Sequence, residues 1–111
     1  MAKFTVRVEL HESHGVEPSG DDYEELHLAM QRSSYFRVIQ SGDGNWYHLP
    51  HAEYTVNWDV LIAAVVNEVK IIVASVWKRF GVFVTESAGR QWYGLKPATD
   101  DEVAELTRTD V

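Results

Sequence analysis

The sequence KFTVRVELH, residues 3–11, alternates apolar and polar side chains and gives the clearest structural signal in the chain. Its apolar members are Phe4, Val6, Val8 and Leu10. Successive side chains of a strand point to opposite faces, so a period of two predicts a β-strand with one buried face. The side chains expected on the other, open face are Thr5, Arg7 and Glu9.

A helix is expected shortly after this strand. A polar loop rich in turn residues ends at Gly20, and either Asp21 or Asp22 is expected to cap the helix that follows. An acidic residue stands three positions after each of them, as in a capping box. The apolar side chains that then recur at helical spacing are Tyr23, Leu26 and Met30.

The middle of the chain predicts a β-hairpin. Residues 35–40 are typical of a strand, and the Gly-Asp-Gly sequence within residues 41–44 is typical of a turn. A third strand is expected over residues 45–58. It should bend or bulge at Pro50, because proline cannot donate a hydrogen bond to a neighbouring strand.

The second half of the chain predicts another helix and two more strands. Asp59 is a suitable N-cap for a helix whose polar residues cover less than half of its surface. A short apolar strand is expected over residues 81–85, followed by a turn at 87–90. Residues 91–95 are expected to pair back on it as a fifth strand.

This order of elements predicts an α+β fold. We expect a ferredoxin-like βαββαβ sandwich, with both helices on one face of an antiparallel sheet and an additional C-terminal hairpin strand. Residues 1–97 are expected to form a single domain. The acidic tail, residues 98–111, is expected to be either disordered or one helical turn capped by Thr99.

Composition excludes several classes of protein. The chain has no cysteine, which excludes disulfides, zinc–cysteine sites and thiol catalysis. The longest apolar stretch, residues 60–77, contains Glu68 and Lys70 and is expected to be a buried helix of a soluble protein and not a membrane span. The first residues do not resemble a signal peptide, so a cytoplasmic location is expected. A net charge of −7 argues against non-specific DNA binding and would suit docking on a basic partner.

The five histidines could form a metal site or act as general acid–base groups. Two pairs are spaced three residues apart: His11 with His14, and His48 with His51. That spacing brings two imidazoles together only in a helix, and both segments look like strand ends or loops. We therefore expect surface histidines, with no metal and no cofactor.

Two arginines could bind phosphate. Arg7 and Arg37 lie on predicted strands, and a guanidinium holds a phosphate in a two-pronged hydrogen-bonded fork. The aromatic side chains that could stack on bases beside them are Trp46, Tyr47 and Trp92. Ordinary cross-strand ion pairs and aromatic packing would account equally for these residues, so the pattern leaves both an RNA binder and a protein binder open.

Several segments taken in order resemble the GhoS family, the endoribonuclease antitoxins of type V toxin–antitoxin systems, and short uncharacterised bacterial and prophage proteins related to it. The segments that carry the resemblance are AKFTVRVELH (2–11), DYEELHLAM (22–30), FRVI (36–39), YHLPHAEY (47–54) and FVTESAGRQWYGL (83–95). The resemblance implies a ferredoxin-like fold akin to that of CRISPR-associated nucleases. It also implies a cytoplasmic protein that cleaves the messenger RNA of a toxin.

The resemblance also suggests which residues would act on RNA. The family's arginine on the first helix aligns with His27, and the first strand ends Glu9-Leu10-His11 without the aspartate of the CRISPR-associated nucleases. We therefore expect cleavage without a metal. His27 or His11 would act as the base that activates a 2′-hydroxyl, and Arg7 or Arg37 would hold the phosphate.

Two alternatives come from other classes of protein. The acidic charge would suit a phage- or prophage-encoded inhibitor, such as an anti-CRISPR-type protein, that occupies a basic site on a host protein without catalysis. The chain could also be a homodimeric interaction module, joined through sheet edges or exposed tryptophans.

Overall fold

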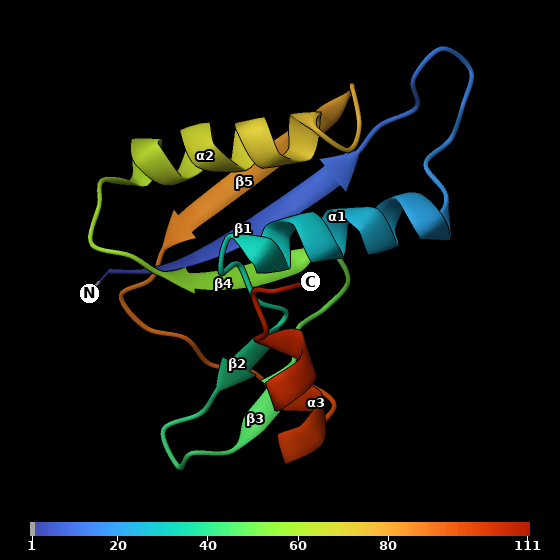
Figure 1. The fold of residues 1–111 in the computed structure, drawn as a ribbon. Coiled ribbons are helices and arrows are strands. Elements are labelled where there is room, and N and C mark those ends of the chain that lie inside the picture. The colour runs from blue at the N-terminus through green and yellow to red at the C-terminus, as the bar shows by residue number, and fades with distance from the viewer. Residues whose placement is uncertain (1) are drawn as a thin grey trace.

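The computed structural model describes residues 2–111, and its central element is strand β1 (Lys3–Leu10). The predicted alternation is confirmed, because Phe4, Val6, Val8 and Leu10 are all at most 5% exposed. β1 pairs antiparallel with β4 (Glu53–Asn57) on one side and with β5 (Phe80–Glu86) on the other. The result is a three-stranded sheet in the order β4-β1-β5 (Figure 1).

Helices α1 (Gly20–Arg32) and α2 (Ile62–Ala74) cover the same face of this sheet (Figure 1). Both helices place buried side chains in one core with the Phe4 face of β1. The fully buried helical members of that core are Leu26, Met30, Val65, Val69 and Val73. Each contributes roughly 1.5–3 kcal/mol by leaving water. We call the opposite face of the sheet, which carries Arg7 and Glu9, the open face.

The start of each helix differs from the prediction. Ser19, and not Asp21 or Asp22, is the N-cap of α1; its hydroxyl accepts from the Asp22 amide, and the Asp22 carboxylate accepts from the Ser19 amide. Asp22 is therefore the third residue of the helix and closes a capping box. Asp59 does not cap α2, because Leu61 is still extended and the helix begins at Ile62 without a side-chain cap.

The predicted third strand is divided in two. Strands β2 (Val38–Gln40) and β3 (Trp46–His48) form a separate two-stranded sheet, and residues 49–52 turn the chain before β4. Ala52 has a left-handed φ of 58°, which breaks the strand just after the expected bend at Pro50. An isolated bridge from Phe36 to Thr55 joins the small sheet to the edge of β4.

The predicted fifth strand over residues 91–95 is wrong. After β5 the chain crosses to the small sheet, where a bridge joins Pro97 to Tyr47 and the Ala98 amide donates to the Trp46 carbonyl at 2.9 Å. Pairing with β3, which has a free edge, replaces the expected hairpin with β5.

The tail forms a third helix. α3 (Asp100–Leu106) is capped by Thr99, as one of the two expectations for the tail stated, and Glu102 closes the capping box. The α+β class is thus confirmed, with three helices and two antiparallel sheets. Within residues 2–111, no helix is long and apolar enough to cross a membrane.

Candidate functional site

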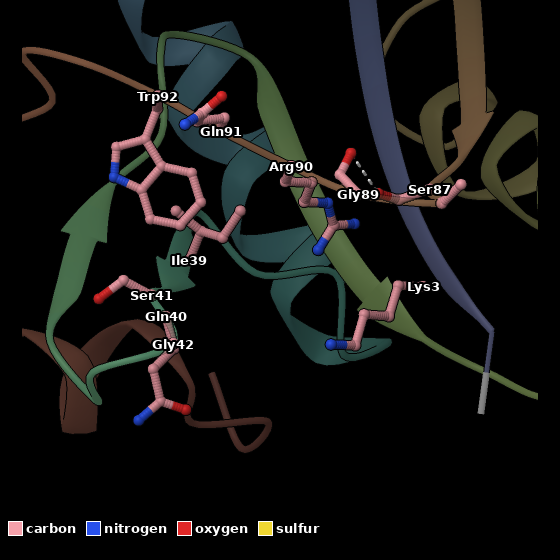
Figure 2. Close-up of a pocket in the computed structure, with 11 residues that line it drawn as sticks. Lys3, Ile39, Gln40, Ser41, Gly42, Ser87, Gly89, Arg90, Gln91 and Trp92 are labelled. Atoms are coloured by element: carbon pink, nitrogen blue, oxygen red, sulfur yellow. Dashed lines mark hydrogen bonds between the residues drawn. The ribbon is translucent and has the colours of Figure 1, made fainter.

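A cleft lies where the segment after β5 passes the β2–β3 turn, and we call it the Arg90 cleft (Figure 2). Its volume is about 450 Å³. Three stretches of chain that are distant in sequence meet there: Lys3 at the start of β1, residues 39–42 around the end of β2, and residues 87–92. The polar side chains among them are Lys3, Gln40, Ser41, Ser87, Arg90 and Gln91.

Arg90 is the most unusual group in this cleft. Its Nε and Nη2 atoms are buried, and neither has a hydrogen-bond partner within residues 2–111. Burial lowers the pKa of the Arg90 guanidinium from its ordinary value, but the group remains charged at neutral pH because that value is so high. A buried donor without a partner costs about 1–3 kcal/mol, so this arrangement is unfavourable unless an acceptor binds there.

The electrostatics of the cleft favour an anion. Lys3 supplies a second positive charge, and none of the described residues that line the cleft is acidic. Figure 2 shows the Lys3 and Arg90 side chains on the same side of the cleft, across from the Ser41–Gly42 turn. A guanidinium presents parallel N–H groups that match two oxygens of a phosphate or a carboxylate.

The cleft continues along the open face of the sheet. A second hollow of about 290 Å³ shares Lys3, Gln40 and Arg90 with it. This hollow reaches Thr55 and Asn57, which stand opposite Thr5 and Lys3 in the β1–β4 register. The two hollows together make a polar groove from the turn of the small sheet to the start of β1.

Aromatic side chains stand in the wall of the Arg90 cleft and on the open face itself. Trp92 is partly buried in the wall of the cleft and packs edge-on against Tyr47, with ring centroids 5.7 Å apart. Phe83 is 70% exposed in the middle of β5 and lies opposite Arg7 in the β1–β5 register. A shallow hollow of about 180 Å³ lies between this pair and Glu9.

The structure separates the four predicted site residues into two groups. Arg7 is exposed on the open face, and His11 follows the end of the same strand, where its Nδ1 lies 3.3 Å from a Glu9 carboxylate oxygen. His27 and Arg37 lie elsewhere. His27 is only 4% exposed and lies on the buried face of α1, on the covered side of the sheet.

His27 belongs to a cluster of rings and charges. Its Nδ1 lies 2.7 Å from the Tyr54 hydroxyl, and its ring centroid is 5.7 Å from that of His51. Burial, followed by the positive charges of Arg37 and His51, lowers the pKa of His27 from 6.5 to about 4. The imidazole is therefore neutral at pH 7. Arg37 Nε is itself buried and has no partner within residues 2–111.

The sequence reasoning did not identify Lys3 and Arg90 as site residues. In sequence, residues 87–90 are typical of a turn, and nothing in their spacing indicates that Arg90 lines a cleft. One usable signal was present: Arg90 is the only charged residue between Glu86 and Lys96.

Within residues 2–111, no three His, Asp or Glu side chains come together in a way that could hold a metal ion. Comparisons of the chain with protein-family models, with curated proteins and with solved structures gave no match.

Proposed function

We propose that this protein acts on RNA by binding a single strand along the open face, with one phosphate held in the Arg90 cleft. The observation that carries the proposal is the buried Arg90 guanidinium, whose Nε and Nη2 have no hydrogen-bond partner among residues 2–111. Together with Lys3 it supplies two positive charges in a polar groove. A phosphodiester in the cleft would neutralise the local charge and offer acceptors to a guanidinium that turned toward it.

Features around the cleft favour a single strand over a duplex. Unstacked bases are recognised by stacking on aromatic rings; Trp92 offers such a surface in the wall of the cleft, and Phe83 offers another farther along the open face, opposite Arg7. The groove covers only a small part of the surface. The net charge of −7 means that the rest of the surface repels a long polyanion. Binding should therefore depend on these few residues and not on a general attraction to nucleic acid.

The arrangement of strands supports the fold implied by the GhoS resemblance. The order β5-β1-β4, continued by the bridge from Thr55 to Phe36, agrees with a ferredoxin-like sheet whose second strand is mostly detached. This protein would then be a cytoplasmic antitoxin-like endoribonuclease that cleaves a toxin messenger RNA.

Among the predicted catalytic groups, the geometry favours His11 with Arg7. His11 is exposed and follows the strand that carries Arg7 on the open face, the same face that holds the groove. His27 is buried and bonded to Tyr54, and its lowered pKa makes it a weak base. In this scheme His11 takes the 2′-hydroxyl proton, and Arg7 stabilises the charge that develops on the phosphate.

The first test measures binding by fluorescence anisotropy with a labelled single-stranded RNA of about 12 nucleotides, within the usual site sizes of such proteins. Arg90→Gln should weaken binding at least about tenfold, because it removes a charge-assisted pair of hydrogen bonds. Lys70→Gln is the matched control, since Lys70 is exposed on α2, on the other side of the sheet. Equal affinities for Arg90→Gln and the wild type would overturn the proposal.

The second test measures cleavage. The wild type is incubated with mixed cellular RNA, with and without EDTA, alongside His11→Ala and His27→Gln. Cleavage that resists EDTA and disappears in His11→Ala but persists in His27→Gln is expected. If RNA is bound but never cut, the protein is a binder alone. If it is neither bound nor cut, an acidic segment of a partner protein becomes the better candidate for the Arg90 cleft.

A further inference from the structure

We infer that the outer surface of α1 and α2 is the interface of a symmetric homodimer. This inference is independent of the proposed action on RNA. It starts from apolar side chains that the fold leaves in water on the helical side of the molecule. Leu28 of α1 is 43% exposed and Ile71 of α2 is 74% exposed. Exposed apolar residues that cluster, as opposed to standing singly, mark interaction surfaces.

Leu28 and Ile71 stand on opposite walls of one groove. The groove has a volume of about 630 Å³ and runs between the C-terminal halves of the two helices. Its α2 wall also includes Ile72 and Val76, and its α1 wall includes Ala29. A small residue beside Leu28 lets another helix approach closely, so the groove can accept an apolar side chain from a partner.

The charges on α1 indicate which partner fits. Glu25 and Arg32 both line the groove, and they stand one on each side of the Leu28–Ala29 pair. They are seven residues apart, which is about two helical turns, so both lie on the same stripe of the helix as that pair. Along the helix, the stripe therefore has an acidic residue, then an apolar pair, then a basic residue.

Such a stripe is complementary to itself when it is reversed. In a two-fold symmetric dimer, residue i of one copy contacts residue j of the other, and j contacts i. If the axis passes between Leu28 and Ala29, two α1 helices cross with opposite directions and Glu25 of each copy meets Arg32 of the other. Leu28 of each copy then enters the groove lined by Ile71 of its partner. Two ion pairs would thus flank a shared apolar centre.

Contacts within the chain leave Glu25 and Arg32 available to pair with a second copy. Among residues 2–111, Arg32 donates only from Nε, to the Leu28 carbonyl at 3.3 Å, so its terminal nitrogens are available. Within the described residues, Glu25 forms no ion pair. The surface is also on the side of the sheet away from the open face, so a dimer formed there leaves the Arg90 cleft uncovered.

The test is sedimentation equilibrium across about 1–200 μM protein, a range suited to a modest interface. The wild type should show a monomer–dimer equilibrium. Glu25→Arg and Arg32→Glu should each weaken the dimer at least about tenfold, because symmetry replaces two attractive pairs by two repulsive ones. The double variant, Glu25→Arg with Arg32→Glu, should recover the wild-type constant within about threefold.

Mixing the two single charge-reversal variants tests the predicted pairing of Glu25 with Arg32 most directly. When the two single variants are combined in equal amounts, each supplies the charge that the other lacks, so a heterodimer should form although neither variant dimerises well alone. Ile71→Asp should abolish the dimer with little change in thermal stability, because the side chain is exposed in the monomer. A wild type that stays monomeric throughout would overturn the inference. So would single charge reversals without effect, or a mixture that fails to associate.

Discussion

The Nδ1 atom of His27 and the hydroxyl oxygen of Tyr54 lie 2.7 Å apart in the layer between α1 and β4. Both side chains are buried, with Tyr54 completely inaccessible. Burial, helped by the nearby charges of Arg37 and His51, holds the pKa of His27 at about 4. In the unfolded chain this imidazole would titrate near 6.5. The burial of His27 therefore couples folding to pH.

The first prediction concerns acid sensitivity. Between pH 6.5 and about 4 the unfolded chain binds a proton at His27 that the folded protein does not, so the free energy of unfolding falls as the pH falls. The loss is absent above pH 6.5 and complete below about 4. Its slope for one group is at most about 1.4 kcal/mol per pH unit. Urea denaturation at pH 7.5, 6 and 5 measures it.

His27→Gln keeps a polar group beside Tyr54 but cannot titrate, so its stability should depend less steeply on pH than that of the wild type. His14→Asn, a change in the exposed loop before α1, is the control and should leave the slope unchanged. Identical slopes for the wild type and His27→Gln would show that His27 is not the group responsible.

The second prediction concerns how α3 is held. The side-chain amide of Gln31, which is 5% exposed on α1, donates to the carbonyls of Glu105 and Arg108, each at 2.8 Å. Gln31→Ala leaves both carbonyls without this donor and should lower the free energy of unfolding of the α3 segment by about 1–3 kcal/mol. Hydrogen exchange of the amides in residues 100–108 should accelerate accordingly.

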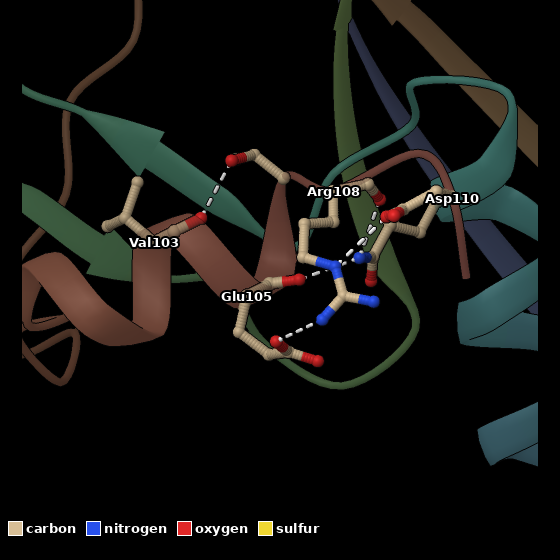
Figure 3. Close-up of polar contacts among 6 residues, drawn as sticks. Val103, Glu105, Arg108 and Asp110 are labelled. Atoms are coloured by element: carbon tan, nitrogen blue, oxygen red, sulfur yellow. Dashed lines mark hydrogen bonds and ion pairs between the residues drawn. The ribbon is translucent and has the colours of Figure 1, made fainter.

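Arg108→Ala is the control for Gln31→Ala. Its guanidinium pairs with Glu105 at 2.9 Å and with Asp110 at 3.0 Å, but all three side chains are exposed (Figure 3). Exposed ion pairs contribute little, so Arg108→Ala should slow or accelerate exchange by much less than Gln31→Ala does. If the two variants behaved alike, the docking of α3 would not depend on the Gln31 amide.

The third prediction concerns the start of α1. Ser19→Ala removes the hydroxyl that caps the Asp22 amide and should lower the free energy of unfolding by about 1 kcal/mol. Ser33→Ala, at the other end of the same helix, removes a hydroxyl that makes no hydrogen bond within the described residues and should change stability by less than about 0.5 kcal/mol. Thermal unfolding of the two variants, side by side, measures the difference.

The fourth prediction concerns the effect of Arg90 on the stability of the free protein. Because its buried Nε and Nη2 find no partner in the described part of the chain, Arg90→Met should leave the melting temperature of the free protein unchanged or raise it. A residue retained for binding can lower the stability of the free protein, because its buried donors are unsatisfied until a ligand binds. A melting temperature lowered by several degrees would instead show that Arg90 has a structural role.

The parts of the fold that sequence predicted well are those with strong periodic patterns. β1 alternates over eight residues, and α1 carries Leu26 and Met30 on one stripe, so in both elements the local pattern agrees with the core. These patterns are sufficient to predict the α+β class. The boundaries were less predictable, because the cap at Ser19 and the start of α2 at Ile62 depend on how loops enter each helix.

Features built from distant segments could not be predicted. Residues 91–95 look like a strand, but the chain that follows them finds its partner in β3, across the molecule. The Arg90 cleft arises only when Lys3, residues 39–42 and residues 87–92 meet. Likewise, no local pattern separates Arg7 on the open face from His27 on the buried face of α1 before the helix packs on the sheet.

The position of β1 at the centre of the sheet also has a consequence for the time course of folding. Its neighbours are distant in sequence, with β4 beginning at Glu53 and β5 at Phe80, so β1 has no hairpin partner nearby. Long loops must close before either pair of strands can form, which slows folding. Until β5 pairs with it, β1, whose four apolar side chains are all buried in the folded protein, keeps an unprotected edge and is open to aggregation.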